Sequence, residues 1–139
     1  MVNPQQPAAP SRPTPLSDIG LGDLRQIYLF SGFDDEQLAA IKHTMRVLSL
    51  VEGERLFDHG QPARNFFFVR KGQLKLFRVS PEGDEKVIEI VRGGETFAEA
   101  VMFMERKGGY PVSAEAIEVT EAWSFDEKVM LSLLRESVD

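Results

Sequence analysis

From residue 46 onward, short runs of apolar, β-branched and aromatic residues alternate with glycines. The runs are RVLSLV, RLFD, NFFFVRK, QLKLFRVS and EKVIEIVR, and each is followed by a turn that contains Gly53, Gly60, Gly72, Gly83 or the pair Gly93-Gly94. Strand-length runs that each end in a turn residue are typical of antiparallel sandwiches and barrels. The pattern predicts a mainly β domain, and the segments PVSAEAIEV (111–119) and TEAWSF (120–125) add two more strands.

Three of these segments predict local detail. "KGQ" at 71–73 predicts a tight hairpin between the strands on either side of it. "SPEGD" at 80–84 predicts a second turn, in which Pro81 fixes φ and Gly83 is free to adopt a positive φ. The run "FFFV" at 66–69 is apolar at consecutive positions, which indicates a strand that is covered on both faces.

Two helical regions precede the strands. The second of them covers SGFDDEQLAAIKHTM (31–45), where Asp34 or Asp35 can cap the helix. Its apolar stripe consists of Leu38, Ile41 and Met45. The first region is indicated by apolar residues at roughly helical spacing, namely Leu16, Ile19, Leu21, Leu24, Ile27 and Leu29.

Two further helices interrupt or end the strand series. Residues 98–103 are mostly good helix formers, so we expect one short helix inserted among the strands. Asp126 can cap a final helix over residues 127–136, with an apolar stripe formed by Val129, Leu133 and Met130. The expected fold is mainly β: an antiparallel β-roll (a double-stranded β-helix or jelly roll) with N-terminal helices, one short inserted helix and a C-terminal helix.

Composition limits the classes of function. Residues 1–17 contain five of the eight prolines and almost no large apolar residue, so we expect a disordered tail followed by one domain over residues 18–139. The net charge of −6 and the scattered basic residues argue against DNA binding by this domain itself. The sequence has no cysteine and no apolar run of membrane-spanning length. We expect a cytoplasmic protein that does not contact a membrane.

Two blocks of sequence carry a resemblance to a known family. The blocks HGQPA…FFFVRKGQLKLF and GGETFAEAVMF resemble the sensor domain of bacterial Crp/Fnr transcription regulators, a cyclic-nucleotide-binding-like domain. The resemblance covers about residues 22–139. The form FAEAVMFM is similar to the Dnr-type branch of the family, which responds to nitric oxide.

The resemblance implies an organisation and a mechanism. In the family, a long dimerisation helix and a helix-turn-helix domain follow the sensor domain, so DNA would be bound only through a C-terminal domain that is missing from this chain. The full-length protein would be a homodimer that responds to a small-molecule effector. Effector binding beside residues 98–103 would repack this segment against the dimerisation helix, with Met102, Phe103 and Met104 as the coupling contacts.

The segment around residue 95 has the features of a phosphate-binding cassette. Gly93-Gly94-Glu95 could supply backbone N–H groups just ahead of a helix start. By resemblance, Glu99 stands where cyclic-nucleotide binders use a glutamate to hold the ribose 2′-hydroxyl. A surface carboxylate that is favoured by the helix dipole is the alternative interpretation of Glu99.

The countercharge for a phosphate is missing from this cassette. By the same resemblance, Tyr110 and Pro111 stand where cyclic-nucleotide binders have an arginine and a small hydroxyl residue, and Ala98 replaces a glycine. Tyrosine is neutral and proline has no backbone donor, so losing one charged hydrogen bond weakens binding roughly tenfold to a hundredfold. Arg106 and Lys107 are candidate anion contacts if their loop swings inward, and solvated loop charges otherwise.

We therefore interpret the cassette as the wall of a different effector pocket. The Dnr-type resemblance implies haem as the cofactor, with cAMP or cGMP as the less favoured ligand. The candidate axial ligands are Tyr28, His43 and His59, although the helical position of His43 and the turn position of His59 indicate surface residues. The predicted pocket residues are Phe97, Ala98, Glu99, Ala100, Val101, Met102, Tyr110, Pro111, Val112 and Ser113.

Other functional classes fit the sequence less well. A cupin-like metalloenzyme needs several inward-facing histidines and a carboxylate, which two histidines sixteen residues apart do not provide. No nucleophile motif is present, so we predict no catalytic residues, no metal site and no enzyme activity. Two alternatives stay open: a functional cAMP- or cGMP-binding module, and a ligand-free roll that serves only for protein contact.

Overall fold

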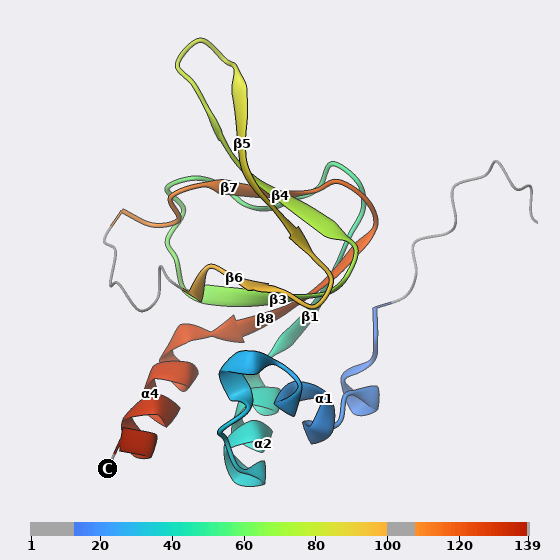
Figure 1. The fold of residues 1–139 in the computed structure, drawn as a ribbon, viewed down its shortest axis with the longest axis vertical. Coiled ribbons are helices and arrows are strands. Elements are labelled where there is room, and N and C mark those ends of the chain that lie inside the picture. Colours follow the sequence, from blue (N-terminus) through green and yellow to red (C-terminus); the bar gives the residue numbers. More distant parts are fainter. Residues whose placement is uncertain (1–12, 100–107, 139) are drawn as a thin grey trace, which may run out of the picture.

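The computed structural model describes residues 13–99 and 108–138, which form a two-sheet antiparallel β-roll (Figure 1). One sheet has the strand order β1-β8-β3-β6 and the other has the order β2-β7-β4-β5. The strands are β1 (Arg46–Leu50), β2 (Arg55–Phe57), β3 (Asn65–Lys71), β4 (Gln73–Val79), β5 (Glu85–Arg92), β6 (Thr96–Phe97), β7 (Ser113–Ala116) and β8 (Thr120–Asp126). The predicted mainly β fold is confirmed.

The central strands β8 and β3 of the sheet β1-β8-β3-β6 are buried on both faces. Phe66 and Phe68 of β3 pack with the helices, whereas Phe67 and Val69 pack with residues of the other sheet. In β8, all residues from Thr120 to Phe125 are buried. Figure 1 shows the reason, since the helices lie against one face of this sheet and the second sheet lies against the other. The prediction that "FFFV" is covered on both faces is confirmed.

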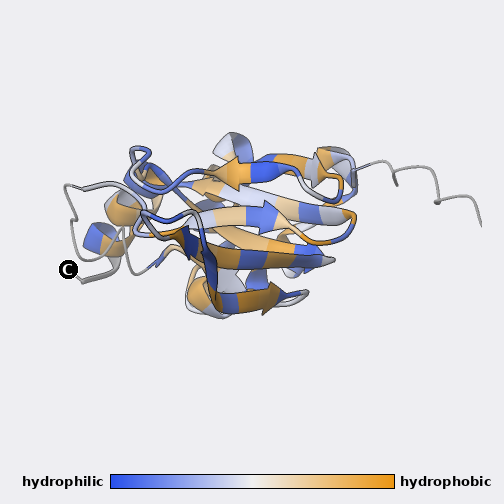
Figure 2. Cartoon of the chain, turned by 90° about the horizontal axis from the view of Figure 1, so that it is seen from above, coloured by the Kyte–Doolittle hydropathy of each residue, from blue (hydrophilic) through white to orange (hydrophobic). Residues whose placement is uncertain are grey.

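The sheet β2-β7-β4-β5 is buried on its inner face. Leu74 and Leu76 of β4 belong to the core between the sheets, and Lys75 between them lies on the outer face, where it pairs with acidic residues. The resulting alternation of hydrophobic and hydrophilic residues along the strands is visible in Figure 2. One covered face and one solvated face are common in antiparallel sheets.

The β4–β5 hairpin extends beyond the roll (Figure 1). Its turn forms as predicted, because Gly83 has a φ of +90° and its N–H donates to the Ser80 carbonyl at 2.9 Å. Towards the turn, Val79, Val87 and Ile88 are exposed. The strand expected over residues 111–119 is shorter in the structure, where β7 covers Ser113–Ala116.

The N-terminal helical region is divided into three short pieces. They are η1 (Leu16–Asp18), α1 (Leu21–Arg25) and η2 (Tyr28–Phe30). The backbone is extended at Ile19 and at Ile27, so helical hydrogen bonding is interrupted on both sides of α1. The apolar residues recognised in the sequence still reach the core, since Ile19, Leu24 and Ile27 are buried.

The helices α2 (Asp35–Thr44) and α4 (Glu127–Val138) begin at predicted caps. Asp34 accepts a hydrogen bond from the Gln37 N–H at 2.8 Å, and the Gln37 side chain accepts one from the Asp34 N–H at 2.9 Å. Asp126 accepts a hydrogen bond from the Lys128 N–H at 2.7 Å. The apolar stripes are also confirmed, by the burial of Leu38, Ile41, Met45, Met130 and Leu133 and the half-burial of Val129.

The turn "KGQ" is not a hairpin, and that prediction was wrong. The strands on either side of Gly72 belong to different sheets, so the chain turns a corner between the sheets at this point. Gly72 has a φ of +94°, and a Cβ there would lie 2.4 Å from Thr120 Oγ1 and 2.5 Å from the Val119 carbonyl oxygen. The Thr120 hydroxyl also accepts a hydrogen bond from the Gln73 N–H at 3.1 Å. Turn residues specify a sharp bend but not the partner of the following strand.

A buried carboxylate holds the start of the described chain. Only 2% of the surface of Glu121 is exposed, and its Oε1 accepts the Thr14 N–H at 2.7 Å while its Oε2 accepts the Trp123 indole N–H at 2.9 Å. Burial alone would raise the pKa of Glu121, but the hydrogen bonds from Thr14 and Trp123 and the charge of Lys71 lower this pKa below its ordinary value of 4.5. Thr14, which was assigned above to a disordered tail, is thus bonded to the domain; residues 1–12 lie outside the described residues.

The substitution Gly72→Ala should destabilise the protein much more than Gly83→Ala. Both glycines have positive φ, so each alanine introduces a similar backbone penalty of about 1–2 kcal/mol. At Gly72 the new Cβ also collides with Thr120, whereas no heavy atom lies within 4 Å of a Cβ at Gly83. Such crowding adds about 1–3 kcal/mol. Urea unfolding followed by Trp123 fluorescence measures both losses, and equal losses would contradict the role of Gly72 at the corner.

Candidate functional site

Four aromatic side chains fill the interior of the roll next to the cassette. The Tyr110 ring is stacked on Phe57 with 3.8 Å between the ring centroids, and Phe67 lies 5.6 Å from Phe57 and 5.3 Å from Phe97. None of the four is more than 5% exposed. We call Phe57, Phe67, Phe97 and Tyr110 the aromatic cluster. The cluster includes two of the predicted pocket residues, Phe97 and Tyr110.

The hydroxyl of Tyr110 is used within the protein. It donates a hydrogen bond to the Asn65 carbonyl at 2.9 Å and accepts one from the Asn65 N–H at 3.3 Å. Burial raises the pKa of the phenol above 10.0; backbone hydrogen bonds from Asn65 and Arg64 offset part of this rise, and the negative charge of Glu127 adds to it. Tyr110 is therefore a neutral side chain that is fixed at both its ring and its hydroxyl.

The turn at residues 58–61 holds the end of the cassette. The Gly60 N–H donates to the Tyr110 carbonyl at 2.8 Å, and the Tyr110 N–H donates to the Gln61 carbonyl at 3.0 Å. The Ser113 hydroxyl accepts the His59 N–H at 2.9 Å. Gly109 has a φ of +77°, and a Cβ there would lie 2.4 Å from the Gln61 carbonyl oxygen. The "HGQ" turn thus fixes the position of Tyr110, which accounts for its place beside the cassette.

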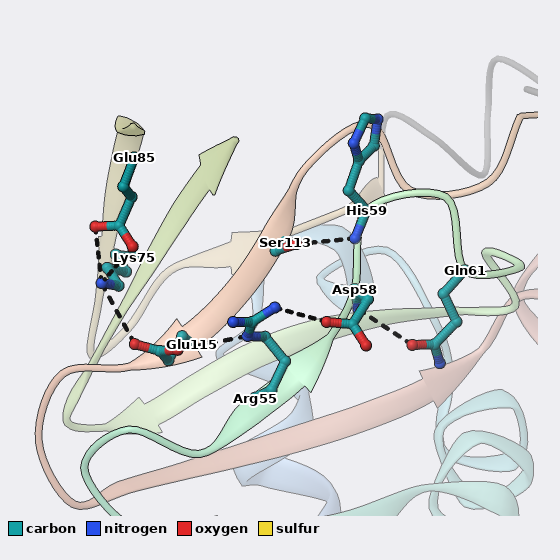
Figure 3. A network of polar contacts seen from close by, with 8 residues as sticks. All are labelled: Arg55, Asp58, His59, Gln61, Lys75, Glu85, Ser113 and Glu115. Atoms are coloured by element: carbon teal, nitrogen blue, oxygen red, sulfur yellow. Dashed lines mark hydrogen bonds and ion pairs between the residues drawn. The ribbon is translucent and has the colours of Figure 1, made fainter. Parts of the chain in front are cut away.

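A network of ion pairs continues from this turn across the solvent-exposed face of the sheet β2-β7-β4-β5 (Figure 3). Arg55 contacts Asp58 at 2.6 Å and Glu115 at 3.4 Å, while Lys75 contacts Glu115 at 3.3 Å and Glu85 at 2.9 Å. Surface ion pairs of this kind contribute about 0–1 kcal/mol each. Because the basic groups already have acidic partners, the network serves to position the turn and the strands rather than to bind an anion.

The start of the cassette carries two unusual features. Ala98 has a φ of +70°, the left-handed region that favours glycine, so alanine is strained where the family resemblance places a glycine. Glu99 Oε2 is buried and has no hydrogen-bond partner among the described residues. A buried polar atom without a partner is a feature that a bound ligand could explain. The structure thus leaves a ligand contact at Glu99 as one interpretation.

The other predicted site residues are distributed as follows. Phe97 and Ser113 are buried, and Ala98, Glu99, Pro111 and Val112 are half-buried. Phe97, Ala98 and Val112 belong to or pack against the same hydrophobic cluster as Tyr110. The predictions for Ala100, Val101, Met102, Phe103, Met104, Arg106 and Lys107 lie outside the described residues.

The candidate haem ligands lie on the surface. Tyr28 is 86% exposed, and His43 and His59 are exposed, as the sequence indicated for the two histidines. The His59 ring Nε2 lies 3.4 Å from the guanidinium of Arg78, outside the aromatic cluster. In residues 13–99 and 108–138, no group of three acidic or histidine side chains is placed to hold a metal. Within the same residues, no helix has the length and apolar character needed to cross a membrane.

A cavity of about 400 Å³ borders Tyr110 and was not predicted from the sequence. We call it the β1–β2 cavity, because Leu48 of β1 and Leu56 of β2 form part of its wall. Gln61, Arg64, Asn65 and Ser124 also line it. The signal in the sequence was Ser124, a polar residue in the otherwise apolar "AWSF" of β8, but this signal does not indicate which residues surround it.

Comparison with known proteins places these features in context. A family described as the cyclic nucleotide-binding domain matches residues 47–137. The CRP-like cAMP-activated global transcriptional regulator of Mycobacterium tuberculosis is 24% identical over 108 residues, which cover 78% of this chain and 47% of that protein. The transcriptional activator protein anr of Pseudomonas aeruginosa is 38% identical over 71 residues, which cover 51% of this chain and 28% of that protein. The chain thus spans about half the length, or less, of these curated relatives.

One solved structure supports the fold directly. The sensor domain of the transcriptional regulator DNR from Pseudomonas aeruginosa matches with a TM-score of 0.77 and 32% identity, and the match covers 81% of this chain and 74% of that chain. The resemblance to Crp/Fnr regulators and to the Dnr branch is therefore confirmed, together with the β-roll fold.

The substitution Tyr110→Phe should keep the stack on Phe57 and remove the hydrogen bonds with Asn65. At about pH 8 we expect the free energy of unfolding to fall by about 1 kcal/mol. Because the pKa of Tyr110 is raised in the folded protein, the unfolded wild type loses this proton first, and the wild type loses stability as the pH rises above 10.0. Urea unfolding at alkaline pH should therefore show a smaller gap between the two proteins, and a gap that is independent of pH would contradict this role.

Proposed function

Because the chain belongs to the cyclic nucleotide-binding domain family, we propose that it is the effector-sensing domain of a Crp/Fnr-type transcription regulator whose effector is not a cyclic nucleotide. The relatives named above are transcription regulators, and this chain matches about half or less of each. In this proposal, the longer protein is a cytoplasmic homodimer that binds DNA through residues beyond this chain. The domain itself is a regulatory module and not an enzyme.

The position of Tyr110 is the observation that carries the proposal. Its ring is stacked on Phe57, and its hydroxyl is bonded to Asn65, so the side chain acts as a plug in the roll interior. A phosphate at this place would meet a neutral phenol instead of a cation. Burying an anion without a countercharge is costly, and the ring would also have to move. Both effects disfavour cAMP and cGMP relative to a smaller ligand without a phosphate.

The mechanism that fits this proposal is a shift between two conformations. The effector would bind beside the segment that starts at Ala98 and favour one arrangement of this segment over another. Ala98 is held at a φ of +70°, and a strained backbone at such a place is suited to a segment with two arrangements. Met102, Phe103 and Met104 would then transmit the change to the dimerisation helix of the longer protein.

A functional cyclic-nucleotide module is the second candidate, and Glu99 is the observation that favours it. Its buried Oε2 has no partner among the described residues, and a ribose hydroxyl could supply one. The relative from Mycobacterium tuberculosis is named as cAMP-activated. In this alternative, Arg106 or Lys107 would neutralise the phosphate in place of the missing arginine.

Haem, with nitric oxide as the signal, is the cofactor suggested by the Dnr resemblance. The roll interior does not fit a haem, because the aromatic cluster fills it and because Tyr28, His43 and His59 all lie outside it. His43 instead lines a shallow depression with Leu16 and Leu21 on the helical side. Among the described residues, none of the three candidate axial ligands is therefore placed to hold a haem inside the roll, and the proposed mechanism does not depend on haem.

Titrations with candidate ligands test the proposal. Calorimetry with cAMP and with cGMP should show no binding tighter than about 10 µM, because the cassette lacks its cation. Tighter saturable binding that is lost in Glu99→Gln, but kept in the matched control Glu89→Gln, would establish the cyclic-nucleotide alternative. Glu89 is the matched control because it is an exposed glutamate on β5 and is not one of the predicted pocket residues.

A haemin titration tests the remaining cofactor. We expect no saturable one-to-one change in the haem absorption band, because no candidate ligand faces the roll interior. A saturable change that shifts again with nitric oxide would make this domain a gas sensor. In that event, the variants Tyr28→Phe, His43→Gln and His59→Gln would identify the axial ligand.

A variant of the longer regulator tests the coupling route. Replacing Met102 and Phe103 by alanine should reduce the effector-dependent change in reporter expression at least about fivefold, because these residues would carry the coupling. Val119→Ala is the matched control, since Val119 is an exposed apolar residue in the β7–β8 turn. An unchanged response in the double variant would show that the coupling runs elsewhere.

A further inference from the structure

The β1–β2 cavity has the size and the composition of a small-molecule site. Its volume of about 400 Å³ lies in the range of about 300–1,000 Å³ that is usual for ligand pockets. Phe57, Phe67 and Tyr110 form an aromatic wall, and Leu48 and Leu56 add aliphatic surface. Such a pocket needs only a few polar groups to orient a ligand. In the β1–β2 cavity these groups belong to Gln61, Arg64, Asn65 and Ser124.

Several of the polar groups in the cavity have unused hydrogen-bonding capacity. Ser124 is only 5% exposed, and its hydroxyl makes no hydrogen bond with any described residue. Gln61 uses its Oε1 to accept the Asp58 N–H, which leaves its NH₂ group free to donate. The guanidinium of Arg64 has no ion-pair partner within the described part of the chain. These free groups are mainly donors, so the cavity is suited to a ligand that accepts hydrogen bonds.

The described residues that line the cavity carry charge of one sign only. Arg64 lines it, and no carboxylate is among its lining residues. Arg46 is the direct antiparallel partner of Ser124, so it projects from the same face of the sheet at the start of β1. Asp126 and Glu127 line a neighbouring depression together with Arg64 and Lys128, and they do not line the β1–β2 cavity. An anionic group is therefore favoured at this end of the cavity.

From these contacts we propose that the β1–β2 cavity binds a small organic acid, with its apolar body against Phe67 and Tyr110 and its carboxylate towards Arg64 and Ser124. Of the described pocket residues predicted for the cassette, Tyr110 lines this cavity, whereas Phe97, Ala98, Glu99 and Ser113 do not. A ligand in the cavity would contact Asn65 and Gln61, and both of these residues hold Tyr110 by hydrogen bonds. A bound ligand would thus change the environment of residues 109–113.

A titration of this chain with sodium benzoate tests the proposal, with amide shifts in ¹H–¹⁵N spectra as the readout. Benzoate should give saturable shifts at Gln61, Asn65 and Ser124 with a Kd of about 1 mM or lower, as expected for a ligand of this size. Benzamide has the same shape without the charge and should bind at least about fivefold more weakly. Arg64→Gln and Ser124→Ala should each weaken benzoate binding by a similar factor.

Arg70→Gln is the matched control, because Arg70 is an exposed arginine on the same strand as Asn65 and does not line the cavity. It should leave benzoate binding unchanged. The proposal is overturned if no saturable shift occurs up to about 20 mM benzoate, if Arg70→Gln weakens binding as much as Arg64→Gln, or if the shifts occur at Phe97–Glu99 instead. None of these results bears on the sensor function, which the cyclic-nucleotide, haemin and reporter experiments test separately.

Discussion

The burial of one sheet on both of its faces is the constraint on which the rest of the structure depends. In the sheet β1-β8-β3-β6, Phe66 and Phe125 face the helices, while Phe67 and Val69 face the second sheet. Burying a side chain of this size contributes about 1.5–3 kcal/mol, but only when the layer that covers it is present. The helices and the second sheet must therefore pack onto this sheet together. The Gly72 corner follows from the same constraint, because it carries the chain from the doubly covered sheet to the sheet that covers it.

The strands could be predicted from the sequence because their residues repeat a local pattern. β3 and β5 match the runs NFFFVRK and EKVIEIVR, and the caps at Asp34 and Asp126 were recognised from single residues. The pairing of the strands could not be predicted in the same way. Gly72 has the chemistry of a hairpin turn, but the collision of a Cβ with Thr120 shows that a distant segment decides the path of the chain. The break at Ile27 is similar, since its apolar side chain suits either a helix or an extended link.

In the candidate site too, the chemistry of single residues could be predicted from the sequence, but contacts between distant residues could not. Tyr110 and Pro111 could be recognised as departures from a phosphate cassette, because the residue type alone shows that the cation and the backbone donor are missing. The place of the Tyr110 ring could not, because Phe57 and Asn65 lie far away in the sequence and meet it only in the folded chain. The contact of Glu121 with Thr14 joins residues even farther apart, and it places part of a proline-rich segment that composition alone assigned to a tail.

Tyr110 takes part in both proposed ligand sites, because its ring belongs to the aromatic cluster beside the cassette and also lines the β1–β2 cavity. A ligand that enters from the cassette must move the ring away from Phe57 and break the hydrogen bonds with Asn65. Opening the plug costs free energy, so the apparent affinity of such a ligand falls with the small fraction of molecules in which the plug is open. A ligand in the β1–β2 cavity meets the same ring already in place and requires no displacement. In these proposals the plug disfavours large ligands at the cassette and leaves room for small ones in the β1–β2 cavity, and either ligand would act on residues 109–113 through its contact with Tyr110.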